Sequence, residues 1–318
     1  MPNAAAFPIT WRTRLRAWWD GYDLDALYQE AIKAQPAEAP PPPVAPLPTR
    51  LESRTDAPDP VLPKPCWDAD RLTAAQLVWG EGAIGPSGEG QLQEIARERR
   101  LTSSSAVVHL GAELGATAER IRRGTGCRVL PLDTLDLMAE ASGGRVSPLG
   151  EAPIPAAGTV DLVLMDHLAE RGEPLSQIVR DQGRILKREG RMVIRTLVLT
   201  TAGGDRRQGD GSALEAWRAE ELCTPRLRTV AELRRIVENA GLRVERDRSK
   251  TDAYVAEIET AWRTSIDTIR LLSARGNMET VGAHLIAEGE RWLARVTLLE
   301  SGVMDYRELV AMPERRGR

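Results

Sequence analysis

The amino-acid sequence predicts an α/β protein built on a doubly wound, mostly parallel, seven-stranded sheet, with a helical arm before it and helical additions after it. Two observations predict this fold class. From residue 67 onward, short apolar runs alternate with amphipathic segments of helical length, which is the pattern of parallel strands joined by crossover helices. The first apolar run leads directly into a glycine turn and a helix, in the stretch AVVHLGAELGATA over residues 106–118.

The predicted elements follow one another in order along the chain. Short apolar runs indicate five strands, and a sixth begins after Gly241, which is a natural C-terminal cap for the helix before it. The strands are expected over residues 106–110, 127–132, 146–149, 160–165, 192–199 and from 242 onward. The helices are expected over residues 91–100, 117–123, 135–141, 175–187 and 230–240, and residues 258–299 are expected to be mostly helical.

Residues 1–34 are predicted to form an amphipathic arm that is rich in aromatic residues. Two short patterns of apolar residues fall there at helical spacing. The arm either folds back onto the main domain, or it binds a protein partner or a second copy of the chain. Tryptophan and tyrosine dominate the energetics of protein interfaces, so the candidate partner-binding residues are Trp11, Trp18, Trp19 and Tyr22.

Residues 35–65 are predicted to be a linker, because they are rich in proline and alanine. A segment of this composition buries too little apolar surface to form a core, and its prolines favour extended geometry. The domain organisation expected from the sequence is therefore an arm over residues 1–34, a linker over residues 35–65 and one folded domain over residues 66–318.

Composition excludes several classes of function. The chain has 318 residues, a net charge of −3 and three scattered cysteines, so nothing draws it in bulk to nucleic acid and nothing predicts a disulfide framework or a zinc site. No apolar run reaches the length of a membrane span, and the N-terminus lacks the pattern of a secretory signal. The expectation is a cytoplasmic, soluble protein with no metal, no nucleic-acid partner and no membrane span.

Six segments follow one another along residues 67–312. They are VWGEGAIGPSG, VVHLGAELGATAERIRRGTGCRVLPLD, VDLVLMDHLAE, GRILKREGRMVI, ELRRIVENAGLRVE and RWLARVTLLESGVMDYR. In this order they resemble the motifs of class I S-adenosylmethionine-dependent methyltransferases, and in particular those of small-molecule members such as the phosphoethanolamine methyltransferases. This resemblance implies a Rossmann-like methyltransferase fold with S-adenosylmethionine as the cofactor.

The resemblance also implies which residues would hold that cofactor. Gly111 and Gly115 would shape the turn in front of the first helix. Asp133, at the end of the second strand, would accept hydrogen bonds from the ribose hydroxyls, although it is equally placed to cap the helix near Leu135. Glu151 would contact the adenine amine.

Two departures from the family pattern lie in the same turn. Glu113 replaces the middle glycine, where its side chain would occupy part of the ligand's volume, unless it accepts hydrogen bonds from the first amides of its own helix. His109 replaces the acid that closes the first strand, and it is expected to be a histidine satisfied by backbone groups. These departures make cofactor binding doubtful.

Two hypotheses about function follow. In the first, the protein is a non-catalytic or weakly active binding or scaffolding subunit with a degenerate cofactor site. In the second, it is an active methyltransferase that acts on a small amine or hydroxyl substrate. Asp166 and His167 are the only weak candidates for catalysis, because they follow the fourth strand, and the simpler interpretation places both in a surface loop.

Overall fold

The computed structural model describes residues 67–314, apart from residues 172–173, 201–209, 223–224 and 275–278. All of them belong to the second of the two units into which the chain divides, Cys66–Arg318. The predicted arm and linker, together with Trp11, Trp18, Trp19 and Tyr22, lie outside the described residues. Their roles therefore stay predictions.

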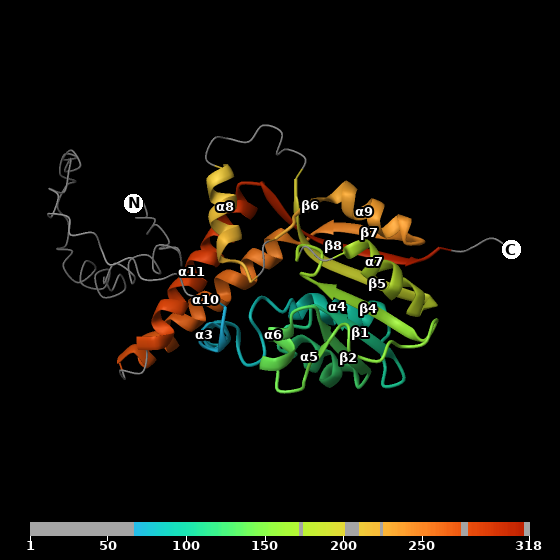
Figure 1. Ribbon diagram of the computed structural model, residues 1–318, viewed down its shortest axis with the longest axis horizontal. Coiled ribbons are helices and arrows are strands. Elements are labelled where there is room, and N and C mark those ends of the chain that lie inside the picture. Colours follow the sequence, from blue (N-terminus) through green and yellow to red (C-terminus); the bar gives the residue numbers. More distant parts are fainter. Residues whose placement is uncertain (1–66, 172–173, 201–209, 223–224, 275–278, 315–318) are drawn as a thin grey trace, which may run out of the picture. The chain divides into compact units, whose positions relative to one another are not determined.

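The described chain forms an α/β domain around one mixed sheet (Figure 1). The strands run in the order β3-β2-β1-β4-β5-β8-β7, with the short β6 beside β5. β8 is antiparallel to both β5 and β7, and the other neighbouring strands pair in parallel. The predicted fold class is confirmed. The bounds of the strands are Ala106–Leu110 for β1, Arg128–Asp133 for β2, Ser147–Pro148 for β3, Val160–Asp166 for β4, Leu186–Leu199 for β5, Arg228–Thr229 for β6, Leu242–Ser249 for β7 and Met304–Pro313 for β8.

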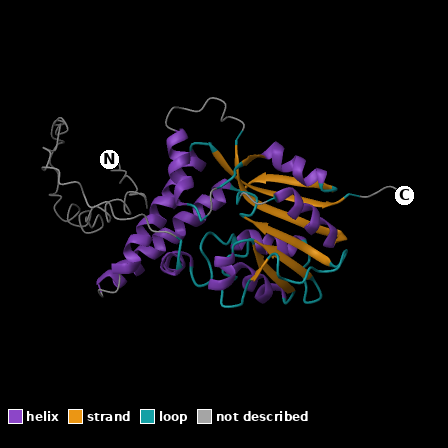
Figure 2. Ribbon diagram, viewed as in Figure 1, coloured by secondary structure: helices purple, strands orange, loops and turns teal. Residues whose placement is uncertain are grey.

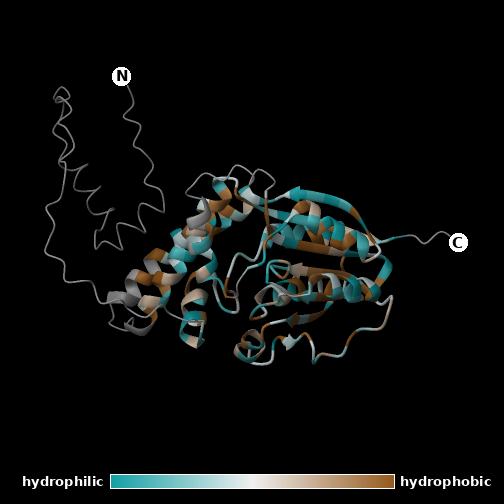
Figure 3. Cartoon of the chain, turned by 45° about the horizontal axis from the view of Figure 1, so that its top comes forward, coloured by the Kyte–Doolittle hydropathy of each residue, from teal (hydrophilic) through white to brown (hydrophobic). Residues whose placement is uncertain are grey.

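Helices cover both faces of the sheet because its central strands are apolar on both sides. Successive residues of a strand point to opposite faces: Val107 packs with α4 (Glu89–Glu98) and α5 (Ala116–Thr125), whereas Val108 packs with α7 (Leu175–Ile185) and α9 (Val230–Asn239). The short helix α6 (Asp136–Ala141) joins β2 to β3. Figure 3 shows hydrophobic residues along the central strands.

A group of helices stands beside the sheet at one end and forms a cap (Figure 2). Its members are α3 (Ala69–Trp79), α8 (Asp210–Glu220), α10 (Thr251–Ala274) and α11 (Glu279–Glu300). α11 packs against α3 and α8, and α10 packs against α3. The helical additions expected over residues 258–299 correspond to α10 and α11. No helix of the described residues is long and apolar enough to cross a membrane.

Candidate functional site

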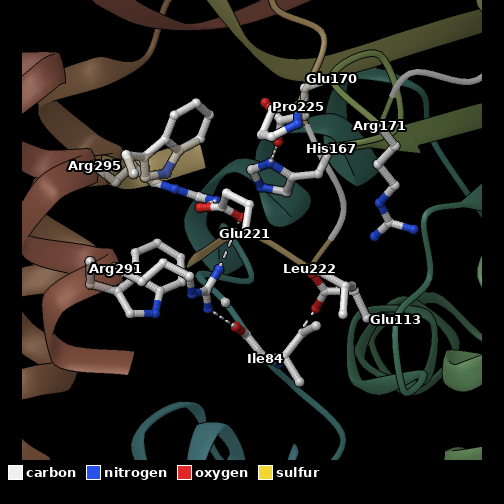
Figure 4. A pocket seen from close by; sticks show the side chains of 13 residues that line it. Ile84, Glu113, His167, Glu170, Arg171, Glu221, Leu222, Pro225, Arg291 and Arg295 are labelled. Carbon is white, nitrogen blue, oxygen red and sulfur yellow. Dashed lines mark hydrogen bonds and ion pairs between the residues drawn. The ribbon is translucent and has the colours of Figure 1, made fainter. Parts of the chain in front are cut away.

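The candidate site is a cleft at the carboxyl ends of β1 and β4, where open α/β sheets bind their ligands. The loop after β1, the loop after β4 and the cap helices α8 and α11 meet there, around a cavity of about 40 Å³. Figure 4 shows side chains from all of these segments directed at the cavity. The site is therefore assembled from segments that are far apart in the sequence.

The turn after β1 requires glycine at two positions. Gly111 has a φ of 70°, and a Cβ there would lie 1.9 Å from the carbonyl oxygen of Asp166. No side chain fits at that distance, so the close approach of β4 demands a glycine. Gly115, with a φ of 99°, precedes the first residue of α5.

Glu113 lies between these glycines in the left-handed region, with a φ of 52°, a conformation that favours glycine. Its carboxylate borders the cavity and accepts a hydrogen bond of 3.4 Å from the backbone N–H of Ile84. The donor to this carboxylate is Ile84 and α5 has no side-chain cap, so the alternative in which Glu113 accepts from the first amides of its own helix is not realised. Burial raises the pKa of Glu113 and the nearby Asp133 adds to the rise, while His167 and Arg171 act against it.

Asp133 is fully buried at the end of β2 and holds three donors. Its Oδ2 accepts a bond of 2.9 Å from the backbone N–H of Glu113. Its Oδ1 accepts one of 3.0 Å from the N–H of Leu135 and one of 2.5 Å from Nη1 of Arg171. The bond to Leu135 lies just ahead of α6, and that helix has no side-chain cap, so the capping role that the sequence left open for Asp133 is not formed. A ribose would have to displace Arg171 to reach this carboxylate.

His109 forms part of a buried cluster with Asp166 and Arg195. Its Nε2 lies 3.0 Å from Oδ2 of Asp166, so its partner is a side chain and the expected satisfaction by backbone groups is wrong. Arg195 donates to both oxygens of Asp166, at 2.7 and 2.5 Å. Burial alone would raise the pKa of Asp166, but Arg195 and His109 outweigh it and hold that pKa well below its usual range.

The expectation that Asp166 and His167 are surface residues is also wrong. Asp166 is buried, because β5 places Arg195 beside it. His167 borders the cavity with a φ of 53°, and its Nδ1 lies 2.6 Å from Oε1 of Glu170. The other carboxylate oxygen of Glu170 accepts the backbone N–H of Leu197 at 3.0 Å, which fixes the His167–Glu170 pair against the sheet.

The wall opposite the sheet consists of residues that the sequence reasoning missed. Arg295 donates to Glu221 at 2.5 Å, and Arg291 donates to Glu221 at 3.3 Å and to Glu288 at 2.6 Å. Both guanidinium groups lie 4.5 Å from the ring centre of Trp292, within cation–π range. One signal in the sequence marks this wall: Glu288, Arg291, Trp292 and Arg295 fall on one face of a helix.

Glu151 lies outside this constellation. It is an exposed residue in the turn after β3, where its N–H donates to the carbonyl of Pro148 at 3.2 Å. It does not line the cleft.

The residues of the cleft do not fit S-adenosylmethionine as they are placed. The cavity of about 40 Å³ is far below the ~300–1,000 Å³ of small-molecule pockets. Arg171 forms an ion pair with the carboxylate of Asp133. The Glu113 carboxylate borders the space beside the turn, and the His109 ring contacts Asp166. The groups to which the resemblance assigns the ribose and the methionine end of the cofactor are thus engaged by other groups of the chain in this structure.

The strand order and the antiparallel β8 define the fold of class I methyltransferases. No family model matches the chain, and no curated protein matches its sequence. Likeness to known proteins is therefore a matter of structure, and at the identities found it concerns the fold.

Three solved structures illustrate this likeness. Phosphoethanolamine N-methyltransferase 2 of Haemonchus contortus, in complex with phosphomonomethylethanolamine and S-adenosylhomocysteine, is 13% identical with a TM-score of 0.62, covering 78% of this chain and 59% of that one. A putative sarcosine dimethylglycine methyltransferase from Galdieria sulphuraria is 14% identical with a TM-score of 0.56, covering 78% and 98%. A cyclopropane synthase from Mycobacterium tuberculosis is 13% identical with a TM-score of 0.58, covering 77% and 94%. The chain thus spans less than two thirds of the Haemonchus enzyme's length.

Proposed function

We propose that this protein is a methyltransferase-fold protein whose cofactor cleft is closed by its own side chains, and that it serves as a non-catalytic binding or scaffolding subunit. The fold resembles that of S-adenosylmethionine-dependent small-molecule methyltransferases. Because one fold hosts many functions, the function has to be argued from the site.

The observation that carries the proposal is that Asp133 is buried and its carboxylate is already bonded within the chain. Its carboxylate is fully buried and holds Arg171 and two backbone N–H groups. A ligand hydroxyl would have to break a buried ion pair, which leaves an uncompensated charge and costs about 3–5 kcal/mol. That cost is about half of the binding free energy of an ordinary cofactor site, since a micromolar Kd corresponds to about 8 kcal/mol.

Glu113 supports the same conclusion independently. Its carboxylate lies in the cleft with one long hydrogen bond of 3.4 Å, and its backbone is held in a conformation that costs a residue other than glycine about 1–3 kcal/mol. A ligand lying against this turn would have to displace or bury that charge further. The turn is therefore kept in shape while its ligand-facing surface is blocked.

Calorimetric titration with S-adenosylhomocysteine tests the proposal. The wild-type chain is expected to bind more weakly than about 1 mM, a threshold equal to about 4 kcal/mol of binding free energy. The double variant Glu113→Gly/Arg171→Ala is expected to gain measurable binding. The matched control, Glu140→Ala/Arg180→Ala, removes the same charges at exposed positions and should behave as the wild type.

The opposite outcome is equally clear. Micromolar binding of S-adenosylmethionine or S-adenosylhomocysteine to the wild-type chain would reject the closed cleft. It would favour the alternative, an active methyltransferase acting on a small amine or hydroxyl substrate. Transfer of a radiolabelled methyl group from S-adenosylmethionine to a panel of such substrates would then identify the reaction.

A further inference from the structure

A second hollow of the domain lies in the groove between α4 and α5, away from the cleft. Its volume is about 500 Å³, and its floor is formed by Leu92 and Ala96 of α4 and Ile121 of α5. None of its lining residues borders the cleft. Grooves of this kind between two helices receive the apolar face of a third amphipathic helix.

The rim of this α4–α5 groove is basic. Arg97, Arg120 and Arg123 line it together with a single acid, Glu89. Nη1 of Arg120 is buried there without a hydrogen-bond partner, whereas Arg123, whose side chain is 79% exposed, already pairs with Glu119 at 2.8 Å. A carboxylate on an incoming helix would satisfy Nη1 of Arg120. The groove therefore selects an acidic partner with large apolar side chains.

The sequence contains a segment of this chemistry in the predicted arm. Between residues 18 and 31, four acids and no basic residue accompany two tryptophans and two tyrosines. Leu24, Leu27 and Tyr28 fall on one face of a helix that Asp23 is placed to cap. The pattern combines an apolar stripe with negative charge beside it, which is complementary to the floor and the rim of the groove.

The linker favours a partner molecule over the same molecule. Residues 35–65 are rich in proline, and such a segment acts as a semi-rigid spacer of up to ~95 Å when it is extended at ~3.1 Å per residue. A domain of this length has a radius of gyration of only ~18 Å. A spacer of this reach is long enough for the arm to contact a second molecule.

We propose that residues 18–31 of one copy dock in the α4–α5 groove of a second copy, so that the chain self-associates through reciprocal arms. The inference does not depend on whether the cleft binds a cofactor, because the groove and the cleft share no residue. Titration with S-adenosylhomocysteine therefore tests the closed cleft, and the oligomeric state of the chain tests the docking of the arm.

Sedimentation velocity of the full chain over a range of concentrations tests this association. The groove variant Arg97→Glu/Arg123→Glu and the arm variant Asp23→Lys/Asp25→Lys are each expected to weaken self-association by about tenfold or more, because each reverses two charges at the contact. An equimolar mixture of the two variants should regain wild-type association, since every arm then meets a groove of opposite charge.

The control variant Arg180→Glu/Arg184→Glu makes the same change of charge at exposed positions on α7 and should associate as the wild type. Melting temperatures of all variants should agree with that of the wild type, because the substituted groove arginines are exposed. The proposal is overturned if the full chain is a monomer at every concentration. It is also overturned if charge reversal in the groove leaves association unchanged, or if the mixture fails to restore it.

Discussion

Arg171 and Asp133 form a buried ion pair between the loop after β4 and the end of β2, with Nη1 2.5 Å from Oδ1. The side chain of Arg171 is 6% exposed and that of Asp133 is fully buried. The same carboxylate also holds the backbone N–H of Glu113. One acid therefore joins three loops of the cleft. The carboxylate of Asp133 therefore contributes to the internal structure of the domain.

Removal of Arg171 should destabilise the domain strongly. Arg171→Ala leaves the Asp133 charge buried without its cation, and such losses cost about 3–5 kcal/mol. Urea unfolding followed by circular dichroism measures the change. Arg180→Ala, an exposed arginine nearby in sequence, should stay within about 0.5 kcal/mol of the wild type. Equal behaviour of the two variants would contradict the structural role of the pair.

Glu113 should make stability depend on pH. Its pKa is raised in the folded chain above the ordinary 4.5, so the folded state holds the proton at pH values where the unfolded state has lost it. The penalty is absent below about pH 4.5 and grows as pH rises through the folded pKa. Glu113→Gln should therefore stabilise the domain at pH 7.5, by on the order of 1 kcal/mol, and have little effect at pH 4.

Unfolding of both proteins in urea at pH 4, 5.5 and 7.5 measures this difference. Glu140→Gln removes a carboxylate from an exposed position on α6 and should give no comparable trend. A stabilisation by Glu113→Gln that is constant with pH would show that the carboxylate charge is not the cause.

An acid at position 109 should fail to repair the cofactor site. The family pattern suggests aspartate there, but Nε2 of His109 already lies 3.0 Å from the buried Asp166. His109→Asp would remove the donor to Asp166 and bury a second carboxylate near it, so that either one of the two takes up a proton or their repulsion destabilises the folded state. We expect a loss of about 2–5 kcal/mol at pH 7 and no gain in binding of S-adenosylhomocysteine.

His109→Gln is the matched variant, because its longer side chain can place an amide N–H near the position of Nε2 and donate it to Asp166. It should retain more than half of the stability that His109→Asp loses, as measured by urea unfolding at pH 7. If the aspartate variant proved as stable as the glutamine variant, the contact between positions 109 and 166 could not be the cause.

The sequence predicts the strands of this domain well because each central strand is a continuous apolar run buried on both faces. β1 and β4 begin and end within a residue of the expected ranges. β5 begins at Leu186, earlier than expected, because Lys187, Arg188 and Glu189 are exposed at its start and mask the apolar pattern. β8 follows the two long helices as a strand that sequence reasoning did not assign, and it inserts between β5 and β7.

The sequence indicated the residues of the site only where they belong to one short segment of the chain. Gly111, Glu113 and Asp133 belong to one β-α-β segment, and their positions follow from it. Arg171, Glu221 and Arg295 come from three distant segments, and only the packing of α8 and α11 brings the last two together. The sequence around a charged helical residue does not reveal its ion-pair partner when that partner lies some 70 residues away, as Glu221 does from Arg295. Sequence reasoning therefore singled out the residues of this segment but not the distant side chains that line the cleft with them.

Glu221 should stabilise the cap helices at neutral pH and lose this effect in acid. Burial alone would raise its pKa, but Arg295 and Arg291 outweigh burial and the net shift is downward. An acid with a lowered folded pKa stabilises the folded state above its ordinary value of 4.5, and the contribution fades as pH falls through the folded pKa. Glu221→Gln leaves two buried guanidinium groups without their shared anion, so a loss of about 3–5 kcal/mol is expected at pH 7. The urea midpoints of Glu221→Gln and the wild type should converge as the pH falls below 4. The control Glu215→Gln changes an exposed residue on α8 and should leave the urea midpoint nearly unchanged at every pH. A deficit of Glu221→Gln that persists undiminished in acid would mean that lost packing, rather than the ion pairs, holds α8 to α11.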